Sequence, residues 1–188
     1  MDALLSALLA CALCEMGGGN QMLSLALAQR FQRDSAVLVG IAVGAMANAA
    51  LSAAGGWLIS TMIASDARTL FLALALVLGG VGLFIAAKHP DTLDSWRTGP
   101  ALTAFAGIFI LGFGDGAQFI ILGLATRTGD PVMAAIGGAI GIFVACAPAV
   151  FLRKPILASG GLLWIRRMGG SILMSIGAVM ALSATSLL

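Results

Sequence analysis

Two acidic residues, Glu15 and Asp115, lie in the middle of long apolar stretches, and each is surrounded by glycines and amides. The first segment reads CEMGGGNQM over residues 14–22, and the second reads LGFGDGAQF over residues 111–119. A charged side chain at the centre of a bilayer costs about 2.5–3.5 kcal/mol on insertion scales, and such residues usually mark an ion or proton pathway. The glycines are poor helix formers, and they favour unwound segments whose carbonyls line a cavity.

These segments offer two carboxylates, backbone carbonyls and the side-chain oxygens of three amides. Such an oxygen-rich set suits hard divalent cations such as Ca²⁺ or Mn²⁺, and two carboxylates match the charge of the ion. When the ion leaves, burial favours the neutral, protonated carboxyl group. For each acid, a protonated side chain that hydrogen-bonds a neighbouring helix is the alternative interpretation. The predicted metal site comprises Glu15, Asp115, Gln21, Gln118 and Asn20.

The composition predicts that these acids lie in a membrane protein. Of the 188 residues, 60% are hydrophobic and 10% are charged, whereas about 25% of the residues in a soluble domain are charged. The basic residues are scattered among short loops, which argues against a nucleic-acid-binding surface. No nucleophile–base pair or phosphate-binding loop is present, so we expect neither an enzyme nor a resident cofactor. The expected partners are a metal ion, protons and the lipid bilayer.

Six apolar stretches approach or exceed the roughly 20 residues that a helix needs to cross a bilayer. They cover residues 3–29, 36–64, 69–87, 100–126, 132–152 and 168–187. The segment 153–167 contains basic residues and a proline, and it is predicted to be a loop. The predicted fold class is therefore an all-α integral membrane protein.

Basic residues are concentrated in the loops after the first, third and fifth predicted spans. Eight of the ten are found there: Arg30, Arg33, Lys88, Arg97, Arg153, Lys154, Arg166 and Arg167. Because short cytoplasmic loops carry an excess of lysine and arginine, both termini are predicted on the non-cytoplasmic side. The chain begins without a basic region before its first apolar stretch, which argues against a cleaved signal peptide. We expect a bacterial inner membrane.

The two halves of the chain repeat one another at a shift of 97 residues over about fifty positions. Each half holds three predicted spans, so the second half enters the membrane from the opposite side. The sequence therefore predicts six transmembrane helices as two inverted three-helix repeats, with a transport site at the midplane between them. A symmetric bundle that transports nothing is the alternative. The predicted parts are the first repeat, 1–87, a cytoplasmic central loop, 88–99, and the second repeat, 100–188.

Longer segments of both halves carry a more specific pattern. The first half contains ALCEMGGGNQMLSLALAQRF and GIAVGAMANAALSAAGGWL, and the second contains GFGDGAQFIILGLATRTGD and APAVFL. With these segments the chain resembles the small Golgi and bacterial manganese/calcium cation–proton exchanger family. That family has a Glu-x-Gly-Asp-Lys/Arg-Ser/Thr motif in each of two inverted three-helix repeats. The resemblance implies export of manganese or calcium in exchange for protons.

Both copies of the motif depart from the family pattern. In the first copy Glu15 and Gly17 match, while glycines and an asparagine replace the aspartate, the basic residue and the hydroxyl residue. In the second copy Gly114 and Asp115 match, and Gly112 stands at the position of the glutamate. One acid remains in each copy and both basic residues are absent. A reduced site that still binds a divalent ion, a site for a different substrate and a decayed site are the three open interpretations.

Other residues suggest alternatives. Cys11, Cys14 and Cys146 could form a softer metal site, although buried cysteine more often serves as a small apolar residue. Asn48 could join the site, although a hydrogen bond between helices is favoured. For His89, a solvated loop position is favoured over a regulatory metal or pH role. The Gly-x-x-x-Gly pairs are expected to be packing faces within the bundle, so no oligomer is indicated. The alternative functions are export of another solute, such as a soft metal or a cationic amino acid, and a non-transporting structural or regulatory role.

Overall fold

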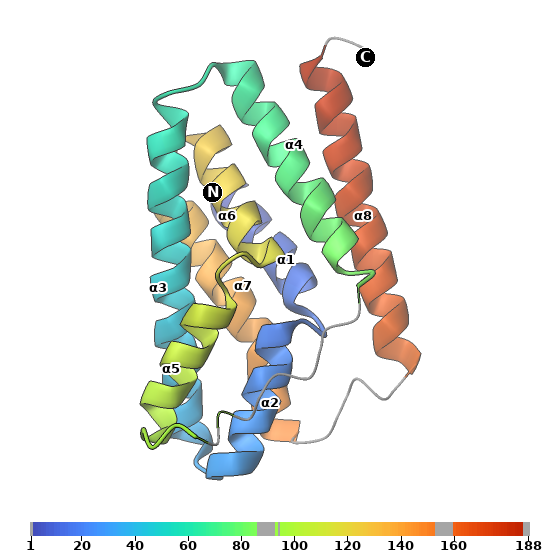
Figure 1. Cartoon of the computed structure of the whole chain (residues 1–188). Helices are drawn as coiled ribbons and strands as arrows, with labels where there is room; N and C mark the ends of the chain where they lie inside the picture. The colour runs from blue at the N-terminus through green and yellow to red at the C-terminus, as the bar shows by residue number, and fades with distance from the viewer. Residues whose placement is uncertain (1, 86–92, 94, 153–159, 186–188) are drawn as a thin grey trace.

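The computed structural model of the chain describes residues 2–85, 93, 95–152 and 160–185, and within them the secondary structure is helical, without strands. Figure 1 shows the helices as one bundle. The helices are α1 (Asp2–Glu15), α2 (Gly19–Phe31), α3 (Asp34–Ser60), α4 (Ser65–Gly82), α5 (Pro100–Leu111), α6 (Gly116–Thr128), α7 (Pro131–Leu152) and α8 (Gly160–Ala184). The bent pairs α1–α2 and α5–α6 and the long helices run alternately down and up along the chain.

Two pairs of helices are sharply bent at short breaks. The axes of α1 and α2 differ by 67°, and the axes of α5 and α6 differ by 69°. Four helices of the described chain are long and apolar enough to cross a membrane, and there are up to six spans if each bent pair counts as one. The prediction of an all-helical membrane protein agrees with this architecture, while the six-span inverted repeat stays a prediction.

One predicted boundary is wrong. Helix α8 begins at Gly160, so residues 160–167 are helical and not part of a loop over 153–167. The apolar run before Arg166 allows the helix to start early, because that arginine is buried against backbone carbonyls. Residues 153–159 lie outside the described residues, as do residues 88–92 and 94 of the predicted central loop, His89 among them.

Glycines allow the long helices to pack against the broken pairs at backbone contact. A Cβ atom added to Gly40 of α3 would lie 2.3 Å from the carbonyl oxygen of Ala101 in α5. A Cβ added to Gly137 of α7 would lie 2.2 Å from the carbonyl oxygen of Leu4 in α1. The second glycine of each Gly-x-x-x-Gly pair makes a similar approach one turn later. These pairs are therefore packing faces inside the bundle, as predicted.

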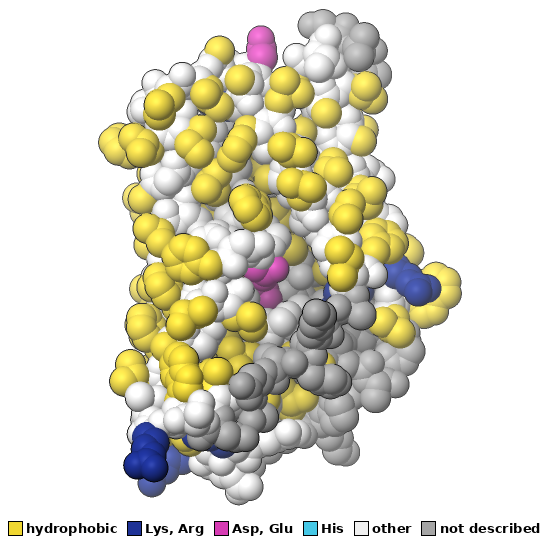
Figure 2. Space-filling model, in the orientation of Figure 1, with side chains coloured by type: hydrophobic (Ala, Val, Ile, Leu, Met, Phe, Trp, Pro, Cys, Tyr) yellow, Lys and Arg dark blue, Asp and Glu magenta, His cyan; other side chains and the backbone are white. Residues whose placement is uncertain are grey.

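The outside of the bundle is covered with large apolar side chains. Leu9, Met46 and Phe151 are among those with more than half of their surface exposed. Figure 2 shows apolar groups over most of one face, with an acidic group at mid-height and basic groups at the lower end and at the right edge. Soluble proteins rarely expose apolar patches of this extent, so the surface suits contact with lipid.

We expect Gly137→Ala to destabilise the protein, because its methyl group would collide with a backbone carbonyl that cannot rotate away. Overpacking of this kind costs about 1–3 kcal/mol. Gly82→Ala is the matched control, since a Cβ on this helical glycine meets nothing within 4 Å. Thermal unfolding in detergent, followed by circular dichroism, should show a lower Tm for the first variant and an equal or higher Tm for the second. Equal Tm values for Gly137→Ala and the wild type would contradict the packing described here.

Candidate metal site at the two helix breaks

Each break contains a glycine with a left-handed backbone, Gly17 with φ 68° and Gly114 with φ 79°. This conformation is accessible to glycine at little cost, and it turns the chain from one helix into the next. Glu15 is the last residue of α1. Asp115 is the N-cap of α6, and its side chain accepts a hydrogen bond of 2.7 Å from the backbone N–H of Gly116.

The two acids therefore lie at opposite ends of helices. An anion is stabilised at the N-terminal end of a helix by the helix dipole and is disfavoured at the C-terminal end. Asp115 has the favourable position, whereas Glu15 has the unfavourable one and is also completely buried. An ionised Glu15 thus needs a nearby positive charge, and without one the neutral, protonated form is favoured.

Asn20, near the start of α2, connects the two acids. Its side-chain nitrogen donates to Glu15 Oε1 at 2.7 Å and to Asp115 Oδ2 at 3.5 Å. Two buried acceptors beside these bonds, Glu15 Oε2 and Asn20 Oδ1, have no hydrogen-bond donor among the residues that the structure describes. Buried polar atoms nearly always have a partner, so an unpaired pair of oxygens next to a second carboxylate suits a cation or a proton.

A small cavity of about 10 Å³ lies among these groups, with Glu15, Asn20, Asn48, Asp115 and Gln118 in its wall. Its size is close to the space that one water-sized sphere occupies. Four of the five residues predicted for the metal site therefore surround one cavity, and Gln21 is not among its lining residues.

The two glutamines brace the breaks in the same way. Gln21 Oε1 accepts a hydrogen bond from the backbone N–H of Gly17 at 2.8 Å, and Gln118 Oε1 accepts one from Gly114 at 2.7 Å. The side-chain nitrogen of Gln21 also donates to the carbonyl of Ala145 in α7 at 2.5 Å. Their role in this structure is to satisfy backbone groups freed by the breaks, and ligation of a metal by them stays a prediction.

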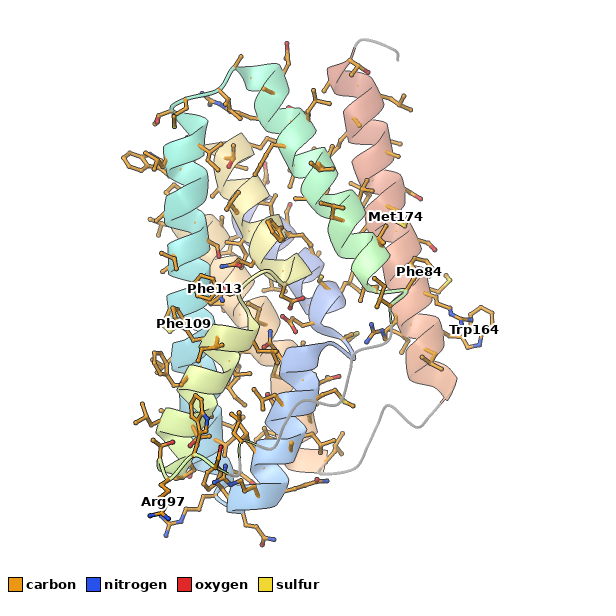
Figure 3. The ribbon with its side chains drawn as sticks, viewed as in Figure 1. Phe84, Arg97, Phe109, Phe113, Trp164 and Met174 are labelled. Carbon is orange, nitrogen blue, oxygen red and sulfur yellow. The ribbon has the colours of Figure 1, made fainter. Side chains whose placement is uncertain are left out.

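Asn48 of α3 lines the same small cavity and also bonds a neighbouring helix. Its side-chain nitrogen donates to the carbonyl of Phe109 in α5 at 3.4 Å, which agrees with the expected bond between helices. Phe109 lies near the end of α5, and Phe113 lies in the break that follows it (Figure 3). A Cβ on Gly112 would come within 2.5 Å of the Asn48 nitrogen. The Asn48 amide therefore occupies the space that the Cβ atom of a larger residue at position 112 would need.

The thiols do not assemble into a soft-metal site in this structure. Cys11, Cys14 and Cys146 are free and buried. The Cys11 thiol donates weakly to the carbonyl of Ala117 at 3.7 Å. Within the described part of the chain, no group of three or more histidine, cysteine, aspartate or glutamate residues is arranged to hold a metal ion. The three cysteines thus behave here as small apolar residues.

Sequence reasoning missed Arg166, which it assigned to a cytoplasmic loop. The side chain is only 5% exposed. It donates to the carbonyls of Leu83 at 3.2 Å and Ile85 at 2.8 Å, and also to the carbonyl of Gly17 in the first break. The signal that was available is the apolar run LLWI before this arginine, which extends the last helix and brings the guanidinium into a span.

An apolar helical bundle with an acid at each of two helix breaks is typical of membrane proteins that move ions. Residues 3–91 of the chain match the model of the family described as divalent cation/proton antiporter GDT1. The resemblance predicted from the two motifs is thereby confirmed. The matched region contains the first break with Glu15.

A protein of Vibrio cholerae named "Putative manganese exporter" is 26% identical over 159 residues, which cover 82% of this chain and 78% of that protein. The fold comparison matched no solved structure. Together, the family match and this relative support a divalent cation transporter in the membrane.

We expect Gln21→Met to be more destabilising than Gln118→Met, although the two glutamines occupy equivalent positions. The first change leaves the N–H of Gly17 without a partner inside the bundle, where an unsatisfied buried group costs about 1–3 kcal/mol, and it also removes the bond to the carbonyl of Ala145 in α7. The second change removes a single bond to Gly114, which is exposed. Thermal unfolding of both variants in detergent measures the difference. Equal losses of Tm would show that Gln21 does not hold the first break as described.

Proposed function

We propose that this chain is a secondary transporter that exports a divalent cation, Mn²⁺ first and Ca²⁺ second, in exchange for protons. The observation that carries the proposal is the meeting of Glu15 and Asp115, from two helix breaks about 100 positions apart in sequence, around Asn20. The family description names a divalent cation/proton antiporter, and the Vibrio cholerae relative carries the name of a manganese exporter. Both descriptions agree with the chemistry of the site.

Oxygen atoms dominate the proposed binding site. Glu15 Oε2 and Asn20 Oδ1 are free to accept a cation, and the Asp115 carboxylate lines the same cavity. Carboxylate and amide oxygens are the preferred ligands of Ca²⁺ and Mn²⁺. The two carboxylates together balance the charge of the ion, which makes its binding in the low dielectric of the bundle favourable.

Exchange with protons follows from the unequal positions of the two acids. Glu15 is buried at the C-terminal end of α1, where its anion needs a compensating positive charge. The divalent ion supplies that charge when it is bound, and a proton supplies it after the ion leaves. Asp115, at the N-terminal end of α6, lines the same cavity and attracts the next cation. Glu15 is therefore the principal proton carrier in this proposal.

The inverted repeat provides a route for alternating access. In the proposed architecture, each half contributes a broken span, and the ion lies near the midplane between the two breaks. Both termini would lie on the non-cytoplasmic side of a bacterial inner membrane. Arg30, in the last turn of α2, lies beside the basic segment that contains Arg97, because it donates to the carbonyls of Leu93 at 2.5 Å and Trp96 at 2.9 Å. Such basic loops are typical of the cytoplasmic side.

The decisive experiment measures Mn²⁺ flux into proteoliposomes under an imposed pH gradient. Gradient-driven flux should fall at least about tenfold in Glu15→Gln and in Asp115→Asn, because removing either charge leaves the divalent ion incompletely neutralised. Asp66→Asn, at an exposed position in the first turn of α4, is the matched control and should transport like the wild type.

Size-exclusion profiles and Tm values must show that each variant is folded. Wild-type flux through folded Glu15→Gln would refute the site assignment. If folded wild-type protein carries neither Mn²⁺ nor Ca²⁺, the substrate assignment fails, and competition with Cd²⁺, Zn²⁺ and cationic amino acids identifies the class of cargo.

A further inference from the structure

We propose that Arg166 is a tethered cation that closes the entrance to the metal site, and that the transported divalent cation displaces it. This inference rests on the proposed function for the identity of the displacing ion. The closure of the entrance by Arg166 can be tested independently of the proposed function.

Arg166 connects three parts of the chain that are far apart in sequence. It comes from α8, and its donors bind the carbonyls of Leu83 and Ile85 at the end of α4 and the carbonyl of Gly17 in the first break. Its neighbours in α8 behave differently: Arg167 is exposed, and Trp164 is 68% exposed and points away from the bundle (Figure 3). A guanidinium group has a rigid fork of five donors, which suits it to bind several carbonyls at once.

A second cavity, of about 450 Å³, contains both Arg166 and Asp115 in its wall. Cys14 and glycines of both breaks, including Gly18 and Gly114, also line it. The guanidinium and the Asp115 carboxylate thus line the same space with opposite charges. Because Asp115 also lines the small cavity at Glu15 and Asn20, the larger cavity is the approach to the proposed metal site.

The carbonyl of Gly17 is the point of competition. A carbonyl released from helical hydrogen bonding at a break is a typical oxygen ligand for a transported cation. In this structure it accepts a hydrogen bond from Arg166 instead. The guanidinium thus occupies a carbonyl of the first break and places its positive charge in the cavity that Asp115 also lines.

A divalent ion and the guanidinium repel one another strongly inside a bundle of low dielectric. In the proposal, an ion that enters through the larger cavity meets this repulsion before it reaches Asp115, and its entry drives Arg166 to release Gly17. Since α4 and α8 pack against each other and the guanidinium joins them to the first break, this release uncouples the α4–α8 pair from the site. Arg166 is in this sense a positioning residue and not a metal ligand.

The reactivity of Cys14 tests the closure directly. In a protein with Cys11→Ala and Cys146→Ala, Cys14 is the remaining thiol of the chain, and it lines the cavity beside Arg166. Without metal, Arg166→Gln should increase the rate of Cys14 labelling by N-ethylmaleimide at least about tenfold, since loss of the fork opens the entrance. Arg167→Gln is the matched control and should leave the rate unchanged. Arg166→Lys should give an intermediate rate, because it keeps the charge but not the fork.

Displacement by metal is measured on the same proteins. Saturating Mn²⁺ should accelerate Cys14 labelling when Arg166 is present and should have no further effect in Arg166→Gln. In proteoliposomes, Arg166→Gln should lower the apparent KM for Mn²⁺ at least about fivefold, because the repelling charge is gone. A purely structural role would instead reduce the maximal rate through loss of folded protein and would leave KM unchanged.

The outcomes separate this inference from the proposed function. Labelling of Arg166→Gln at the parental rate overturns the closure. Acceleration by Mn²⁺ that is equal with and without Arg166 overturns the displacement. If Arg166→Gln opens the cavity but folded wild-type protein neither transports Mn²⁺ nor responds to it, the closure stands while the Mn²⁺ displacement and the proposed function fail.

Discussion

The rest of the structure depends on one constraint, which is that a helix broken inside a membrane must satisfy its freed backbone groups within the protein. Each break answers this requirement with a glutamine, Gln21 or Gln118, bound to the N–H of the left-handed glycine. In the first break Arg166 also satisfies the carbonyl of Gly17. The polar residues that form the candidate site are thus first of all the residues that make two broken helices stable in an apolar bundle.

The two breaks are similar in backbone but opposite in electrostatics. Glu15 ends a helix while Asp115 begins one, so the helix dipoles act on the two carboxylates with opposite sign. One carboxylate at the C-terminal end of a helix and one at the N-terminal end of another are not equivalent. In the proposed exchange, this difference assigns uptake of the proton to Glu15. This division would be lost if the same acid of the motif had been retained in both halves. It gives a physical meaning to the unequal departures of the two copies from the family pattern.

Local features of the fold and the site could be predicted from the sequence, and long-range ones could not. Apolar stretches and glycines predicted the spans and both breaks, because these features depend on the composition of contiguous residues. The meeting of Glu15 and Asp115 could be expected because each acid lies in the motif of its own half, although at a different position of that motif. The bonds of Arg166 to Gly17 and of Gln21 to Ala145 join residues more than 100 positions apart, and no periodicity in the sequence reports such pairs.

The place where the two halves differ most is the place where Arg166 acts. In the proposed inverted repeat, α4 and α8 are equivalent helices. Among the described residues α4 packs on α6, whereas α8 makes no comparable contact with α2 and packs instead against α1 and α4. An inverted repeat alternates access by giving its halves different conformations in each state. Arg166 ties α8 to the first break, and no residue in the described part of the chain makes the equivalent bond from α4 to the second break, which is a physical reason for the two halves to differ.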